Sequence, residues 1–172
     1  MASLSKFETA PRTQLMSEIK SARCVMLSSP NPDEMPQPMA PQIDDAMIER
    51  AGSGAVIYFF SDNTSDLGKA VLADPGATVT ACHIDADYQA SLRGRIYPEH
   101  DKALVERFWN PIAASWYPGG QDDPKMLMLR FEPEQAAIWA SSGNPLKFLY
   151  ETAKANLTDS LPDVGKSKVI NT

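Results

Sequence analysis

The stretch Trp116-Tyr117-Pro118-Gly119-Gly120-Gln121-Asp122-Asp123-Pro124, followed by Met126-Leu127-Met128-Leu129-Arg130, is the most distinctive part of the sequence. The pair Gly119-Gly120 predicts a turn, because glycine adopts positive φ angles at little cost. Pro124 favours an extended residue before it, and the apolar residues that follow predict a strand. We therefore expect a long loop that carries aromatic side chains and joins a helix to a strand.

The composition is that of one globular domain. A chain of 172 residues can bury one sizeable core, and its 43% hydrophobic and 22% charged residues are not those of a disordered protein. The net charge of −6, without a run of Lys or Arg, argues against a nucleic-acid or anionic-membrane partner. No apolar stretch approaches the roughly 20 residues that a membrane-spanning helix needs.

Cysteine and histidine usage points to a reduced compartment and to no metal site. Cys24 and Cys82 each lie in an apolar run, so we expect two buried free thiols. The first residues lack the basic start and apolar core of a secretory signal, which favours a cytoplasmic protein. His83 and His100 have no metal-binding spacing, and we expect His83 to be a hydrogen-bonded strand residue.

Hydrophobic periodicity predicts a mainly β, α+β fold: an antiparallel barrel with peripheral helices. The predicted strands cover residues 24–28, 37–43, 55–61, 77–84, 88–97, 125–131 and 135–140. The predicted helices cover residues 11–21, 66–73 capped by Ser65, 98–109, and 145–157 capped by Asn144. The polar residues from Thr158 onward are expected to be loose or to lie across a partner subunit.

Eight of these segments, in this order, resemble the FMN-binding split-barrel proteins related to pyridoxamine 5′-phosphate oxidase, and among them the general stress protein branch. They are Ala22–Leu27, Gln37-Pro38-Met39, Tyr58–Ser61, Ser65-Asp66-Leu67, Arg93-Gly94-Arg95, Trp109-Asn110-Pro111, Trp116–Pro124 and Ile138-Trp139. The resemblance implies a six-stranded antiparallel split β-barrel as a single flavin-binding domain over residues 1–157, followed by a polar C-terminal tail over 158–172. It also implies a homodimer with flavin sites at the subunit interface.

The same resemblance implies a set of flavin contacts. Residues 37–42 would line the ring, Phe60 and Ser61 would contact the ring and the ribityl chain, and Ser65 would hold the phosphate at a helix N-terminus. Trp139 would pack beside the flavin, and Trp116 would cover it from the other subunit. The implied cofactor-binding residues are Gln37, Pro38, Met39, Ala40, Gln42, Phe60, Ser61, Ser65, Lys69, Gln89, Trp116 and Trp139.

Three departures from the family pattern affect the expected ligand. Gln37 stands where the family has an arginine and Leu67 where it has a lysine, with Lys69 the nearest substitute. Losing a charge-assisted phosphate contact costs roughly 1.5–3 kcal/mol, so these departures weaken the expected binding of FMN. FMN is still the expected cofactor, with FAD or a weakly held flavin as the alternatives. The segment Pro145-Leu146-Lys147 replaces the Arg-x-His stretch of the true oxidases, which argues against oxidation of vitamin B6.

The sequence leaves several functions open and names no catalytic residue. The first is a flavin-dependent oxidoreductase or redox sensor that exchanges electrons with a small-molecule donor or acceptor. The second is a non-catalytic stress-response module that binds flavin or another planar ligand. The third is an interaction protein with an empty barrel. Arg93 and Arg95 share one strand face and are either solvated or the cationic mouth of a site.

Overall fold

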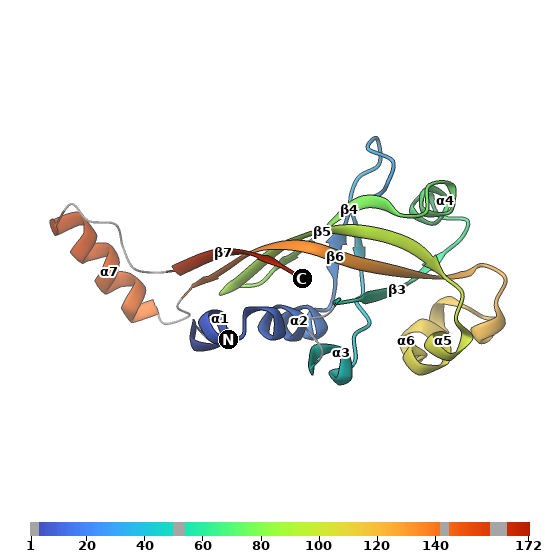
Figure 1. Cartoon of the computed structure of the whole chain (residues 1–172), viewed down its shortest axis with the longest axis horizontal. Coiled ribbons are helices and arrows are strands. Elements are labelled where there is room, and N and C mark those ends of the chain that lie inside the picture. The colour runs from blue at the N-terminus through green and yellow to red at the C-terminus, as the bar shows by residue number, and fades with distance from the viewer. Residues whose placement is uncertain (1–3, 50–53, 142–144, 159–164) are drawn as a thin grey trace.

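The computed structural model describes residues 4–49, 54–141, 145–158 and 165–172. At its centre is an antiparallel sheet in the order β2-β1-β4-β5-β6-β3, with β7 added on β6 (Figure 1). The strands are β1 (Val25–Leu27), β2 (Gln37–Met39), β3 (Ile57–Asp62), β4 (Ala77–Ile84), β5 (Tyr88–Glu99), β6 (Met126–Ser141) and β7 (Gly165–Asn171). Gln42, just after β2, forms two backbone hydrogen bonds with Tyr58 of β3. Six strands thus make a nearly closed barrel with one seam, and the predicted split barrel is confirmed.

Helices lie around the barrel and at both of its ends (Figure 1). They are α1 (Leu4–Thr9), α2 (Pro11–Ser21), α3 (Asp45–Glu49), α4 (Asp66–Ala73), α5 (Lys102–Phe108), α6 (Pro111–Trp116), the 3₁₀ turn η1 (Gly120–Asp122) and α7 (Pro145–Thr158). The predictions for α2 and α4 are confirmed, including the cap of α4, where the Ser65 hydroxyl accepts a hydrogen bond from the Gly68 amide (3.0 Å). The predicted cap of α7, Asn144, lies outside the described residues.

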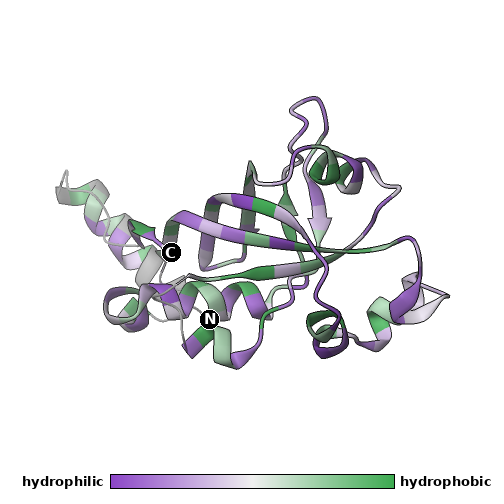
Figure 2. Ribbon diagram, turned by 45° about the vertical axis from the view of Figure 1, so that its right-hand side comes forward, coloured by the Kyte–Doolittle hydropathy of each residue, from purple (hydrophilic) through white to green (hydrophobic). Residues whose placement is uncertain are grey.

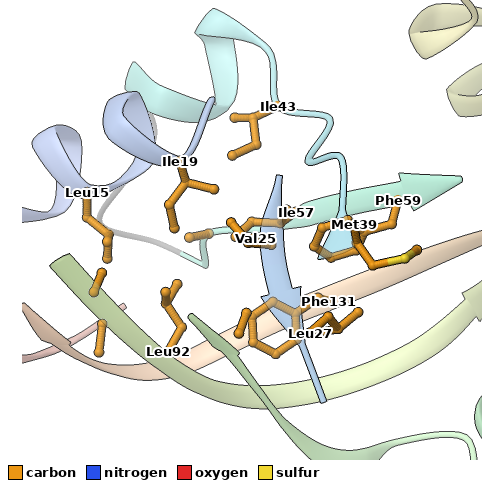
Figure 3. Close-up of a cluster of buried hydrophobic side chains, with 14 of the residues drawn as sticks. Leu15, Ile19, Val25, Leu27, Met39, Ile43, Ile57, Phe59, Leu92 and Phe131 are labelled. Atoms are coloured by element: carbon orange, nitrogen blue, oxygen red, sulfur yellow. The ribbon is translucent and has the colours of Figure 1, made fainter. Parts of the chain in front are cut away.

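The core fills the barrel and extends under α2. Figure 3 shows Leu15 and Ile19 pointing from α2 toward side chains of the strands, and both are fully buried. Phe59 and Phe131, from the paired strands β3 and β6, are buried at the other side of the same cluster. Burial of each such side chain contributes about 1.5–3 kcal/mol. Along the strands, hydrophobic and hydrophilic residues alternate (Figure 2), as the period of two predicts.

The helix predicted over residues 98–109 starts later than expected. Pro98 and Glu99 continue β5 and pair with Leu129 and Met128 of β6. The helix α5 begins only after Asp101, whose carboxylate accepts a hydrogen bond from the Ala103 amide (2.9 Å). Proline at the end of a strand needs no ladder partner for its nitrogen, so the proline here ends a strand rather than opening a helix. Residues 100–125, which join β5 to β6, are called the helical insertion below.

The prediction of two strands around Pro133 is wrong, because β6 is one continuous strand from Met126 to Ser141. Its pairing with β5 shifts between Arg93 and Gly94, which leaves Glu134 as an extra residue opposite the shift. A β-bulge accommodates a proline within a sheet. Gly94 makes the close approach possible, since a Cβ there would lie 2.1 Å from the Glu132 carbonyl oxygen.

Two further expectations are corrected at the C-terminus and at the cysteines. Residues 165–171 are not loose: they form β7, which pairs antiparallel with the second half of β6. Both cysteines are free thiols, but Cys24 is exposed and Cys82 is half-buried, so the expected burial is wrong. Cys82 alternates with buried residues of β4 and therefore points outward from the barrel.

Candidate functional site

The outward face of the sheet carries one uncharged row of side chains that crosses six strands. Strand register aligns them as Pro38, Met26, Cys82, Ser91, Ala137 and Val169, from β2 to β7. Met26 and Val169 are 40% and 63% exposed, although both are apolar. Small and apolar side chains make this face flat and weakly hydrated, as a surface that contacts a planar ligand or another protein would be.

The next row places two of the predicted site residues side by side. Gln89 of β5 pairs with Trp139 of β6, and Ile84 and Ser167 continue the row on either side. The Gln89 side-chain amide donates to the Asp85 carbonyl (2.6 Å), which fixes its orientation. Trp139 is 44% exposed, so its indole offers a flat apolar surface within this row.

A second group of predicted residues lies across the seam of the barrel. Gln37 is half-buried and Pro38 and Ala40 are exposed, whereas the side chain of Met39 belongs to the core. Gln42 pairs with Tyr58, so the segment after β2 runs beside the strand that carries Phe60 and Ser61. Residues 37–42 thus expose backbone groups and small side chains to solvent and do not form a continuous apolar surface.

Phe60 is covered by aromatic residues of the helical insertion. Its ring contacts that of Trp109 edge-to-face (centroids 5.8 Å apart) and lies 6.5 Å from that of Tyr117. The Tyr117 hydroxyl donates to the Ser61 carbonyl (2.8 Å), and burial raises the pKa of this phenol to about 12. Ser61 itself is buried. The cluster ties the insertion to β3 and occupies one side of Phe60.

Within this loop the aromatic residue that lies near Phe60 is Tyr117, which was not among the flavin contacts predicted from the sequence. Trp116 is 76% exposed and contacts no ring of the described residues, whereas the buried Tyr117 anchors the loop. The signal that distinguishes them was present: Trp116 closes a helix that begins at Pro111, and Tyr117 precedes the Pro118-Gly119-Gly120 turn that folds back on β3. Trp116 as a cover for a flavin of another subunit stays a prediction.

The expected phosphate end, at the N-terminus of α4, is acidic. The Ser65 hydroxyl caps the helix and also donates to the Asp62 carbonyl (2.7 Å), so its hydrogen bonds are used within the chain. Hydrogen bonds from the hydroxyl and the amide of Thr64 lower the pKa of the Asp62 carboxyl, which is therefore ionised beside this terminus. Leu67 points into the core. The exposed Lys69 lines a cavity of about 400 Å³ together with Glu34, Asp66 and Asp74.

The two groups of predicted residues do not share a cavity in one chain. Phe60 pairs with Met128, and Trp139 lies eleven residues farther along β6, roughly 35 Å at the usual rise of a strand. Three surface cavities of the described chain have volumes of about 350, 400 and 520 Å³, and Lys69 is the one predicted residue that lines any of them.

The outward charges near these groups are already hydrogen-bonded. Arg93 donates to the Gln135 side chain (3.2 Å), and Arg95 donates to Glu134 (3.3 Å) and to the Gly76 carbonyl (3.1 Å). Both alternatives for this pair, solvated charges or a cationic mouth, are compatible with such contacts.

No three His, Cys, Asp or Glu side chains within the described ranges are arranged to hold a metal ion. None of the helices described here is long and apolar enough to span a bilayer.

The family is decided by similarity over almost the whole chain. Residues 10–163 match the model of the family described as "Pyridoxamine 5'-phosphate oxidase like". The chain belongs to the pyridoxamine 5′-phosphate oxidase-like family. No curated protein matches the sequence.

Solved structures of general stress proteins share this fold. A protein assigned as general stress protein 26 from Jannaschia sp. CCS1 is 31% identical, with 91% of this chain and 95% of that chain covered and a TM-score of 0.74. A general stress family protein from Xanthomonas campestris pv. campestris is also 31% identical, with 84% and 93% covered and a TM-score of 0.64. The general stress FMN/FAD binding protein from Xanthomonas citri is 30% identical, with 77% and 90% covered and a TM-score of 0.64.

Proposed function

We propose that this protein is a cytoplasmic, homodimeric flavin-binding protein of the general stress type, with its flavin held between two copies of the chain. The observation that carries the proposal is the pairing of Gln89 with Trp139 on the exposed sheet face. The family resemblance assigns both residues to flavin contacts, and they meet although fifty positions separate them in the sequence. The similarity to a general stress FMN/FAD binding protein supports the same ligand class.

The chain fits the ring of a flavin better than its phosphate. A flavin ring needs a flat apolar surface and polar groups at one edge, which Trp139, the uncharged row and the Gln89 amide offer. A phosphate needs cations or free N–H donors, but Gln37 is neutral, Leu67 is buried and Asp62 is ionised. We therefore expect weaker binding of FMN than the family pattern gives, and FAD remains the alternative form.

In this arrangement the chain's own residues bind and orient, and they exclude water. A bound flavin would supply the redox chemistry at its ring. The Trp139 indole would cover one face of the flavin ring. The Gln89 amide, already oriented by its hydrogen bond to Asp85, would hydrogen-bond to the polar edge of the ring. Residues 37–42 of the other copy would close the opposite side. No step of this requires a catalytic acid or base from the chain, so an oxidoreductase or a redox sensor of unknown substrate is the activity we propose.

Non-catalytic binding of a flavin or another planar ligand is the second candidate function. The acidic terminus of α4 favours it, because a loosely held cofactor is less suited to repeated turnover. The Pro145-Leu146-Lys147 segment continues to argue against vitamin B6 oxidation.

The deciding experiment is a visible absorbance spectrum of the purified native protein, with chromatography of the material that heat releases. A flavin spectrum, with FMN or FAD in the supernatant at about one per chain, is the expected result. A protein that stays colourless after incubation with both flavins would exclude the flavin proposal. Reduction of the bound flavin on mixing with NADH or NADPH, followed by its reoxidation when an electron acceptor such as dioxygen is added, then separates the oxidoreductase from the binding module.

Two substitutions test the assigned surfaces. Trp139→Ala should change the fluorescence of the bound flavin, and unchanged quenching would remove Trp139 from the site. Gln37→Arg restores the cation of the family pattern and should tighten FMN about tenfold or more, since a charge-assisted contact contributes roughly 1.5–3 kcal/mol. Arg placed instead at the exposed Met35 is the matched control, and equal affinities for both variants would contradict the assignment of Gln37.

A further inference from the structure

The helix α7 stands away from the barrel, at the end where β6 and β7 are joined to it (Figures 1 and 2). Its 14 residues connect two paired strands, so it projects as an arm from the β6–β7 end of the sheet. Leu149, Tyr150 and Leu157 are 64%, 65% and 86% exposed. Together with the exposed Ala153 they cover an arc of about 100° on the helix, which is the apolar stripe of a helix that packs on something.

An arm of this kind is poorly stabilised by itself. Helices shorter than about 12–15 residues are marginal in water, and most of a protein helix's stability comes from the burial of its apolar face. The barrel of the same chain does not bury this face. The stripe therefore needs a surface outside the chain to cover it.

The exposed apolar side chains of the molecule are concentrated on two surfaces that meet at this end. Seven of the eleven large hydrophobic side chains exposed in the described chain lie either on the outward sheet face or on α7. They are Met26, Ile84, Trp139 and Val169 of the sheet, and Leu149, Tyr150 and Leu157 of the helix. Trp139 lies two residues before β6 ends at Ser141, so the sheet face leads directly to the root of the arm.

We propose that α7 packs its apolar stripe on the outward sheet face of a second copy of this chain, and that the second copy's α7 does the same in return. One chain carries both an uncovered helix stripe and an uncovered sheet face, so a two-fold arrangement covers both at once. A peptide or a lipid surface would cover one of them and leave the other exposed. Stable dimers bury about 800 Å² per partner, and adding the arms to the sheet faces enlarges the contact accordingly.

This inference rests on the proposed homodimer and adds a role for the arm. The helix α7 of one copy would cover one side of the Gln89–Trp139 surface of the other copy, so that the flavin site is complete only in the dimer. Binding of flavin and association of the chains are then linked: each strengthens the other.

The test compares two double variants of the full chain by sedimentation equilibrium. Leu149→Glu with Leu157→Glu places charges on the stripe, whereas Met35→Glu with Ile112→Glu places them on equally exposed apolar side chains elsewhere. We expect the first pair to weaken dimerisation at least about a hundredfold and the second to leave it unchanged, because each leucine buries a full side chain in the interface. Circular dichroism checks that each variant folds, and an alanine pair at positions 149 and 157, which keeps the helix, should weaken the dimer in the same direction.

The outcomes separate the arm from the flavin proposal. If the stripe variant dimerises as tightly as the unmodified chain and still carries flavin, that result contradicts the proposed contact of α7 and leaves the proposed flavin site unaffected. An unmodified chain that is monomeric across the accessible concentrations overturns both. If the dimer depends on the apolar stripe but the protein is colourless, the proposed contact of α7 is supported and the proposed flavin binding is excluded.

Discussion

Several buried polar atoms near α2 have no hydrogen-bond partner within the described part of the chain. They are both side-chain amide atoms of Gln14, the Nε2 of His83 and the hydroxyl of Tyr88. His83 and Tyr88 are neighbours (ring centroids 6.3 Å apart), and Glu18, one helical turn after Gln14, acts electrostatically on both. The expected hydrogen-bonded role of His83 is thus not met at its Nε2. Unpaired buried groups cost stability, and Gln14 and His83 each give a measurable prediction.

Gln14→Leu should stabilise the protein. Gln14 is 3% exposed and neither of its amide atoms has a partner, so the substitution removes a desolvation penalty of about 1–3 kcal/mol while keeping most of the volume. We expect the free energy of unfolding in urea to rise by about 1 kcal/mol. The neighbouring Thr13→Ala, at an exposed position, is the control and should change little. A loss of stability in Gln14→Leu would mean that the amide is satisfied in solution.

His83 should make the protein less stable below neutral pH. Burial lowers the pKa of His83, although Asp85 and Glu18 oppose the shift. Because the folded pKa lies below the unfolded value of about 6.5, the unfolded state takes up the proton first as the pH falls. The contribution is complete above pH 6.5 or so and is lost as the pH falls through the lower, folded pKa.

The check is the free energy of unfolding at several pH values between 7.5 and 5, for the unmodified chain and for His83→Gln. The slope due to one proton is at most about 1.4 kcal/mol per pH unit, and His83→Gln should remove it and leave the slope due to carboxylates. The exposed His100→Gln serves as the control. Parallel curves for the unmodified chain and His83→Gln would show that His83 does not titrate differently on folding.

At the scale of elements, the helical insertion is held to β3 and to the segment after β2 by a small number of specific contacts. Tyr58 packs against Phe108 (centroids 5.5 Å apart), Arg107 forms an ion pair with Asp44, and the Asn110 side chain lies 3.4 Å from that of Gln42. The hydrogen bond from Tyr117 to Ser61 closes the loop on the same strand. The insertion therefore fixes one wall of the seam where residues 37–42 run.

Tyr117→Phe should loosen this attachment. The substitution keeps the ring in the cluster but removes the hydrogen bond that the hydroxyl donates to the buried Ser61 carbonyl. We expect this loss to lower the free energy of unfolding by about 1–2 kcal/mol. Trp116→Phe, one residue earlier and 76% exposed, should cost less than about 0.5 kcal/mol. Urea unfolding of both variants gives the comparison. If the two substitutions cost the same, the hydroxyl of Tyr117 contributes nothing to the attachment.

The same elements show what the sequence can and cannot predict. Strand and helix periods, the Ser65 cap and the Pro11 start are local signals, and the elements they predict are present. Continuity of β6 through Pro133 depends on a bulge opposite Gly94, which is a contact between residues about forty positions apart. The burial of Leu67 and the contact of Tyr117 with β3 likewise depend on tertiary packing. For the site, the roles of Gln89 and Trp139 came from the family resemblance. Periodicity gives only the face of each strand, and the register that pairs these two residues is visible only in the structure.

At the scale of the whole molecule, the uncharged row, the exposed Trp139 and the stripe of α7 all lack cover in one chain. Such surfaces are costly in a monomer, and the proposed dimer would cover them despite the net charge of −6 on each chain. Folding and association should therefore be one process rather than two.

The thermal midpoint should rise with protein concentration. When a folded dimer unfolds to two separate chains, each tenfold increase in concentration adds about 1.4 kcal/mol to the stability of the dimer. With an unfolding entropy of about 2.1 cal/mol/K per residue over two chains, this corresponds to roughly 2 °C per tenfold step. Scanning calorimetry and circular dichroism over a hundredfold range of concentration should give a shift of about 4 °C with reversible unfolding. A midpoint that stays constant over that range would mean that the sheet face and the arm are exposed in the native state, and it would contradict the dimer on which the proposed site depends.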